Sequence, residues 1–216
     1  MLVDYWPMSS LKDIAPWGNG ANLYSGLSYS FTTDRFGNAN SAIYFNSGYL
    51  QVPSGIYFGG DFTFSAWINL KSHQSYSRII DFGNGYSNDN VILSFDNTNP
   101  NLFLTIFSGA TQSDLYSSIV LQLNQWYHVA FVLSGTNAFI YINGVITASG
   151  TMLVPNRIQR TANYIGKSNG QNPNADAIYD EIQIYEGAMS SADILSLYTC
   201  TGICKHDSFI LFYYYV

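Results

Sequence analysis

The heptapeptide Tyr179-Asp180-Glu181-Ile182-Gln183-Ile184-Tyr185 has the composition of a β-strand with one residue out of place. With a two-residue strand period, Asp180 falls on the same face as the two isoleucines of this stretch and Ile178 before it. An ionised carboxylate is so costly to bury alone that it must gain a proton, hydrogen-bond donors or a cation. We therefore expect the fold to give Asp180 a metal ion, or else backbone amides or one of two arginines, Arg157 or Arg160.

The rest of the chain is typical of an all-β domain. Its 216 residues suffice for one sizeable core. Short aromatic or β-branched runs alternate with clusters of Gly, Asn, Ser and Pro, as in many strands joined by turns. Residues 138–142 and 145–148 flank Asn143-Gly144, a pair preferred in two-residue hairpin turns, and residues 190–198 predict one short helix. We expect one domain over residues 1–199 and a tail of uncertain status over 200–216.

The composition excludes some functions and leaves others open. The chain has 8 Lys+Arg against 14 Asp+Glu and a net charge of −6, so no basic patch is expected for nucleic acid. The apolar run at residues 209–216 is far shorter than the roughly 20 residues of a membrane-spanning helix. A surface rich in Asn, Ser, Gly, Thr and Tyr suits sugar hydroxyls. The pairing of Cys200 and Cys204 stays open between a short bridge, free thiols and bonds to another chain.

Several motifs along the chain together resemble one known family. In order they are Thr33-Asp34-Arg35-Phe36-Gly37-Asn38-Ala39, Phe62-Thr63-Phe64-Ser65-Ala66-Trp67-Ile68, Trp126-Tyr127-His128-Val129-Ala130, Tyr141-Ile142-Asn143-Gly144, Tyr164-Ile165-Gly166 and Asp180-Glu181-Ile182-Gln183-Ile184-Tyr185. From about Tyr5 to Tyr198, the chain resembles the concanavalin A-like, laminin G-like jelly-roll domains. The resemblance implies a two-sheet antiparallel sandwich with one short helix near the C-terminus. It also implies a secreted or cell-surface module of a larger chain.

The resemblance further implies a calcium site at the rim of the sandwich. Family members often bind one calcium ion with oxygens from the loop after the first strand and from the Asp that opens the Asp-Glu strand. The matching positions are Asp13, Asn19 and Asp180. The chain departs from the family at Pro16-Trp17, where Ser-Gly is more usual, and calcium needs about six to eight oxygen ligands in all.

Three aromatic residues are candidates for binding a ligand. Trp17, Tyr76 and Tyr86 fall in predicted loops, where an aromatic ring can stack on a sugar ring. The alternative is that they are ordinary surface aromatics, since the chain has 18 tyrosines.

Catalysis is not expected. A glycoside hydrolase needs two carboxylates flanking one bond, and no predicted strand carries Asp or Glu at alternating positions. Asp180 and Glu181 are adjacent and would point to opposite faces. We therefore predict a non-catalytic extracellular recognition module that binds calcium and a glycan or protein ligand. A structural spacer without a ligand is the alternative, and a glycoside hydrolase is the least favoured interpretation.

Overall fold

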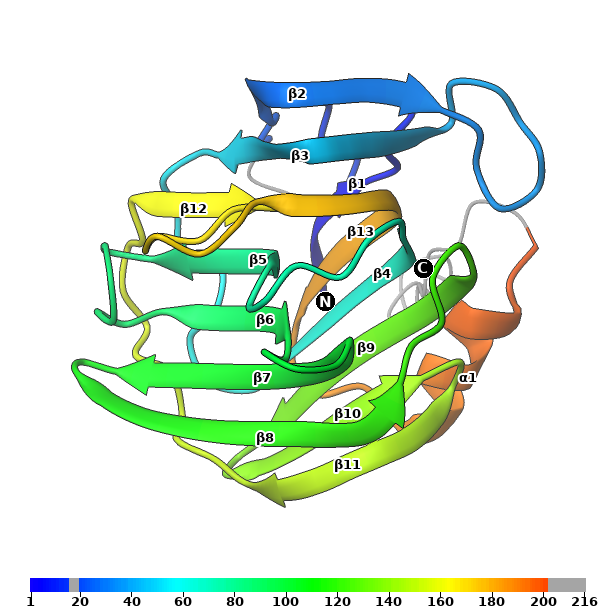
Figure 1. The fold of residues 1–216 in the computed structure, drawn as a ribbon. Coiled ribbons are helices and arrows are strands. Elements are labelled where there is room, and N and C mark those ends of the chain that lie inside the picture. The colour runs from blue at the N-terminus through cyan, green and yellow to red at the C-terminus, as the bar shows by residue number, and fades with distance from the viewer. Residues whose placement is uncertain (16–19, 202–216) are drawn as a thin grey trace, which may run out of the picture.

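The computed structural model describes residues 1–15 and 20–201, with only the backbone of Ser25 (Figure 1). The described part of the chain forms thirteen strands and one helix. In chain order these are β1 (Leu2–Trp6), β2 (Tyr24–Thr32), β3 (Ala42–Val52), β4 (Phe62–Leu70), β5 (Arg78–Gly83), β6 (Val91–Phe95), β7 (Asn101–Ser108), β8 (Thr111–Val120), β9 (Trp126–Ser134), β10 (Asn137–Ile142), β11 (Val145–Thr151), β12 (Ala162–Ile165), β13 (Ala175–Glu186) and α1 (Ser191–Thr199).

The strands form a nearly closed antiparallel sandwich. Their hydrogen-bonded order is β11-β10-β9-β4-β13-β3-β12-β5-β6-β7-β8, with β1 added to β13 and β2 added to β3. In Figure 1, β5 to β8 form the near layer and β4, β9, β10 and β11 lie behind it. The predicted all-β jelly roll with one short C-terminal helix is confirmed. The two layers differ from separate sheets in one respect, because β3 and β12 join them into a continuous ladder.

The main core fills the space between the layers. In β4, Phe62, Phe64, Ala66 and Ile68 all belong to this core, as the strand alternation predicts. A full burial of one such large side chain contributes about 1.5–3 kcal/mol. A smaller core lies on the other face of the back layer, where Ile194 and Leu197 of α1 are buried. The fold therefore covers the back layer on both faces.

The prediction that Asp180 shares one face of β13 with Ile182 and Ile184 is wrong. Tyr179, Ile182 and Ile184 point into the main core, which places Asp180 on the opposite face. The reason is a β-bulge: Asp180 pairs with Trp67, the next paired residue is Gln183 with Ser65, and Glu181 has φ +48°. One extra residue in a strand reverses the inside–outside alternation beyond it.

Two local predictions are confirmed. Asn143 and Gly144 have φ values of 52° and 78° and connect β10 to β11, as a type I′ turn requires. Helix α1 begins after the N-cap Ser190, whose side chain and that of Asp193 form a reciprocal capping box.

Cys200 is disulfide-bonded, which removes the free-thiol alternative for this residue. Within the residues that the structure describes, no helix is both long and apolar enough to cross a membrane.

Candidate functional site

The strongest candidate site is a groove of about 290 Å³ on the outer face of β5 to β8, which we call the outer groove. These four strands are on the near side of Figure 1. The groove floor comes from the strands, and its walls come from the loops before β5, between β5 and β6, and before β13. Its lining residues include Tyr76, Arg78, Asp81, Tyr86, Phe103 and Tyr116.

Aromatic rings form the apolar part of the outer groove. Tyr116 stacks on the buried Phe103, with ring centroids 5.0 Å apart and an interplanar angle of 15°. Tyr76 meets Phe103 edge-on at 6.1 Å. Tyr86 lies against Gly170, where an added Cβ would be 2.8 Å from the ring. Tyr86 is 76% exposed and Tyr116 is 51% exposed, so the groove offers aromatic ring faces to solvent.

The wall loops hold strained backbone conformations. Tyr76 and Ser87 each have φ +55°. The left-handed region costs a residue with a side chain about 1–2 kcal/mol. Such strain is retained where the surrounding structure enforces it, and it gathers at binding sites.

Asp81 organises the groove floor. Its buried carboxylate accepts hydrogen bonds from Asn90 Nδ2 at 2.6 Å, from the Asn169 amide nitrogen at 2.8 Å and from Asn169 Nδ2 at 2.9 Å. Gly83 permits this arrangement, because a Cβ there would lie 2.4 Å from the Asn90 amide group. Burial raises the pKa of Asp81, although these hydrogen bonds and Arg78 oppose the shift. The carboxylate thereby fixes the loop before β13 onto β5.

Arg78 joins the two wall loops to the floor. Its Nη1 donates to Tyr76 O at 2.9 Å and to Ser94 Oγ at 3.1 Å, and its Nη2 donates to Asn172 Oδ1 at 3.0 Å. Burial lowers the pKa of Arg78 below its ordinary value. The guanidinium therefore holds Tyr76 in its strained conformation from beneath.

The structure brings two of the three predicted ligand-binding aromatics together. Tyr76 and Tyr86 both line the outer groove, while Trp17 lies outside the described residues. Sequence reasoning missed Phe103 and Tyr116. Phe103 and Phe107 alternate with the core residues of β7, so an outward face carrying phenylalanines was the signal that could have found the groove.

Asp180 has Arg35 as its partner, and not Arg157 or Arg160. Arg35 Nη1 lies 3.0 Å from Asp180 Oδ2, and its Nη2 lies 3.1 Å from Glu181 Oε2. The guanidinium stacks on Phe36 and on Trp67, with 4.2 and 4.4 Å from its Cζ to the ring centroids. Burial and the neighbouring Glu181 raise the pKa of Asp180 to about 7, and Arg35 opposes this shift.

The other two arginines serve elsewhere. Arg157 pairs with Glu186 at 2.9 Å. Arg160 is fully buried and donates to main-chain carbonyls, including Asp89 O at 2.8 Å. Arg157 and Arg160 therefore contact other groups than Asp180.

Asp13 accepts hydrogen bonds from backbone amides, whereas Asp180 pairs with an arginine. Its Oδ1 accepts from the amide nitrogens of Tyr5 and Ala15, each at 2.9 Å, and its Oδ2 is buried without a hydrogen-bond partner. The charges that shift the pKa of Asp180 are Glu181, Arg35 and Asp34, whereas Asp13 acts on Asp4. Asp13 and Asp180 therefore have different partners among the described residues.

The remaining predicted ligand, Asn19, lies outside the described residues. Within residues 1–15 and 20–201, no group of three or more His, Cys, Asp or Glu side chains is placed to hold a metal ion. A calcium site that includes Asn19 therefore stays a prediction.

Asp4 is a second carboxylate that sequence reasoning did not single out. It is only 1% exposed, and its Oδ1 has no hydrogen-bond partner. Burial and the nearby Asp13 raise the pKa of Asp4 to about 7. Strand β1 and the loop after it therefore place two carboxylate oxygens without donors, Asp4 Oδ1 and Asp13 Oδ2, in one buried region.

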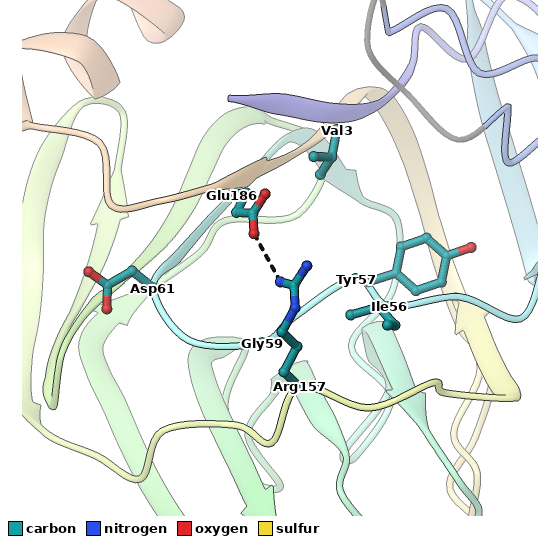
Figure 2. A pocket seen from close by; sticks show the side chains of 7 residues that line it. All are labelled: Val3, Ile56, Tyr57, Gly59, Asp61, Arg157 and Glu186. Carbon is teal, nitrogen blue, oxygen red and sulfur yellow. Dashed lines mark hydrogen bonds and ion pairs between the residues drawn. The ribbon is translucent and has the colours of Figure 1, made fainter.

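A second hollow, of about 150 Å³, lies between the start of β1 and the end of β13 (Figure 2). The Arg157–Glu186 ion pair crosses it in Figure 2, with Asp61 at its edge. Tyr57 is its one aromatic lining residue in the described part of the chain. This hollow is half the size of the outer groove and has fewer rings, which makes it a useful control surface.

The fold and the outer groove define a lectin-like β-sandwich. The chain belongs to the concanavalin A-like lectin/glucanases superfamily, whose laminin G-like family model matches residues 45–195. No curated protein sequence matches the chain.

Solved structures share this fold at low sequence identity. Domain 4 of AbnA, an extracellular GH43 arabinanase from Geobacillus stearothermophilus in complex with arabinotriose, superposes with a TM-score of 0.74 at 20% identity, covering 90% of this chain and 96% of that chain. The botulinum neurotoxin serotype G binding domain gives 0.65 at 17%, covering 92% and 50%. Trypanosoma rangeli sialidase gives 0.55 at 17%, covering 73% and 27%.

These likenesses show the fold alone. The chain spans about half the length of the neurotoxin binding domain and about a quarter of the sialidase. It spans nearly all of the arabinanase domain, which was solved with a bound sugar.

Proposed function

We propose that this protein is a non-catalytic, extracellular glycan-binding module that holds a sugar chain in the outer groove. The observation that carries the proposal is the pair of exposed rings of Tyr86 and Tyr116 in one groove that amide side chains also line. Ring faces bind the apolar faces of sugars, and a few placed polar groups orient the hydroxyls. The arabinotriose complex of the similar arabinanase domain supports the same use of the fold.

The carboxylates around the outer groove do not suit glycoside hydrolysis. That reaction needs one carboxyl group as acid and another as base or nucleophile, both free to reach the bond. Asp81 is buried beneath three donated hydrogen bonds, and Asp114 at the rim is held by Thr105 and Gln112. Burial keeps Asp81 from a bound sugar, which leaves the exposed Asp114 without a second reachable carboxylate among the described lining residues of the outer groove, so we infer binding without turnover.

Glycan binding is tested by removing the rings one at a time. Tyr86→Ala and Tyr116→Ala should each weaken binding to a glycan array by about tenfold, since an aromatic anchor in a binding site contributes more than 1 kcal/mol. Arg157→Ala alters the second hollow and should leave binding unchanged. Binding that survives both tyrosine variants, or no binding by the wild type, would contradict the proposal and leave the structural spacer.

We also infer that calcium, predicted at Asp13, Asn19 and Asp180, would be held at the Asp13 end of that set. Asp13 Oδ2 and Asp4 Oδ1 are buried without donors, whereas Asp180 already has a guanidinium partner. Thermal shift with added calcium tests this inference, because a bound ion stabilises the folded state. Stabilisation should be lost in Asp13→Asn and kept in Asp180→Asn, and the reverse pattern would refute it.

A further inference from the structure

The cation of the outer groove is buried and donates most of its hydrogen bonds within the protein, while its Nε has no hydrogen-bond partner. Arg78 is the one positively charged side chain among the described lining residues. Three of its donated hydrogen bonds go to Tyr76 O, Ser94 Oγ and Asn172 Oδ1. Its Nε lies 3.8 Å from Asp81 Oδ2. An incoming anion would find no exposed guanidinium, which is the group best suited to a carboxylate or a sulfate.

Asp114 gives the rim of the groove a negative charge, whereas the charge of Asp81 is opposed by Arg78. Asp81 lies under the floor, and the exposed Asp114 stands on the outward face of β8 beside Thr105 and Gln112. Burial and the nearby carboxylates of Asp114 and Asp96 raise the pKa of Tyr116. The negative potential therefore reaches the ring that forms the exposed platform.

The polar groups of the floor match hydroxyls better than anions. Asn90 and Asn169 donate to Asp81, so the polar groups that line the groove for a ligand include the hydroxyls of Tyr76, Tyr86 and Tyr116, and a hydroxyl can donate or accept a hydrogen bond. A sugar hydroxyl uses both roles, whereas a carboxylate only accepts. An anionic sugar would lose its water without gaining a cation, and it would face Asp114.

We propose, on the basis of the glycan-binding function above, that the outer groove selects uncharged sugars and rejects sialylated, uronic and sulfated ones. The selection has two causes. Asp114 at the rim repels an anionic sugar, and Arg78 is buried and donates hydrogen bonds to protein groups. Neutral pentose or hexose oligosaccharides are the class that the groove accepts.

The test is a comparison of matched glycans that differ by one charge. Lactose and 3′-sialyllactose, and neutral xylo-oligosaccharides with and without a glucuronic acid branch, would be titrated against the wild type and Tyr116→Ala. For glycans whose binding depends on Tyr116, we expect the charged member of each pair to bind about tenfold more weakly. Stronger binding of the charged member through the groove would overturn the selectivity while leaving glycan binding intact.

A charge variant at the rim separates repulsion from shape. Asp114→Asn keeps a side-chain oxygen for Thr105 and removes the charge, so the difference within each pair should narrow by about threefold at low salt. Asp61→Asn makes the same change beside the second hollow and should leave the difference as it is. If the affinity difference between the neutral and the charged glycan stays the same in Asp114→Asn, repulsion by Asp114 is refuted as the cause of the selection. No glycan signal that depends on Tyr116 would instead refute the proposed function itself.

Discussion

Replacing Asp4 by Asn should change how the stability of the protein depends on pH. Asp4 is buried, and its pKa is raised from 3.8 to about 7. The folded state therefore keeps a proton on Asp4 over a pH range in which the unfolded chain has lost it. Because the folded state binds more protons, the free energy of unfolding falls as pH rises from about 4 to about 7. At 1.36 kcal/mol per pH unit, the full loss is about 4 kcal/mol.

Asparagine has nearly the same shape and cannot ionise, so Asp4→Asn should remove this loss. Urea unfolding, with EDTA present, gives the free energy of unfolding of the variant and of the wild type at pH 4 and at pH 8. The effect is the change in the variant's advantage between the two pH values. The variant should gain up to about 4 kcal/mol over the wild type at pH 8 and little at pH 4. Asp61→Asn, an exposed change of the same kind, is the matched control. An equal effect of Asp4→Asn at both pH values would refute the reasoning, because it would show that ionisation of Asp4 costs nothing.

Three further predictions concern single residues. Arg35→Met leaves two buried carboxylates without their cation and should cost about 3–5 kcal/mol of unfolding free energy, measured with urea at pH 8. Gly170→Ala places a Cβ 2.8 Å from the Tyr86 ring, so calorimetry should show several-fold weaker glycan binding while urea unfolding stays unchanged. Asp81→Asn retains one acceptor oxygen for three donated bonds and should cost about 1–3 kcal/mol, with more proteolysis in the loop that holds Asn169.

The parts of the fold that local spacing determines were predictable. The strand alternation around Phe64, the Asn143-Gly144 hairpin and the cap at Ser190 each depend on residues a few positions apart. The bulge at Glu181 was not predictable in this way. Its register is set by pairing with β4, which lies more than a hundred residues earlier in the chain, and the local sequence shows only an unbroken strand pattern.

The candidate site was predictable only in part, for the same reason. Tyr76 and Tyr86 could be found as aromatics in loops, but their meeting with Tyr116 depends on how the strands of the front layer are ordered. The partner of Asp180 is Arg35, 145 residues away in sequence. A salt bridge between distant segments leaves no periodic signal, so the need for a partner was foreseeable and the identity of the partner was not.

The buried Asp180 charge and the exposed rings of the outer groove lie in different layers of the sandwich, so this charge stabilises the fold away from the groove. Asp180 and its arginine belong to the β4–β13 layer, while Tyr116 and Asp114 belong to the β5–β8 layer. A change at the Asp180 bulge should therefore lower stability without altering which sugar binds. A change at the rim should alter sugar selection at nearly constant stability. The stretch around Asp180 thus contributes to the stability of the fold, while the proposed glycan would contact residues of the opposite layer.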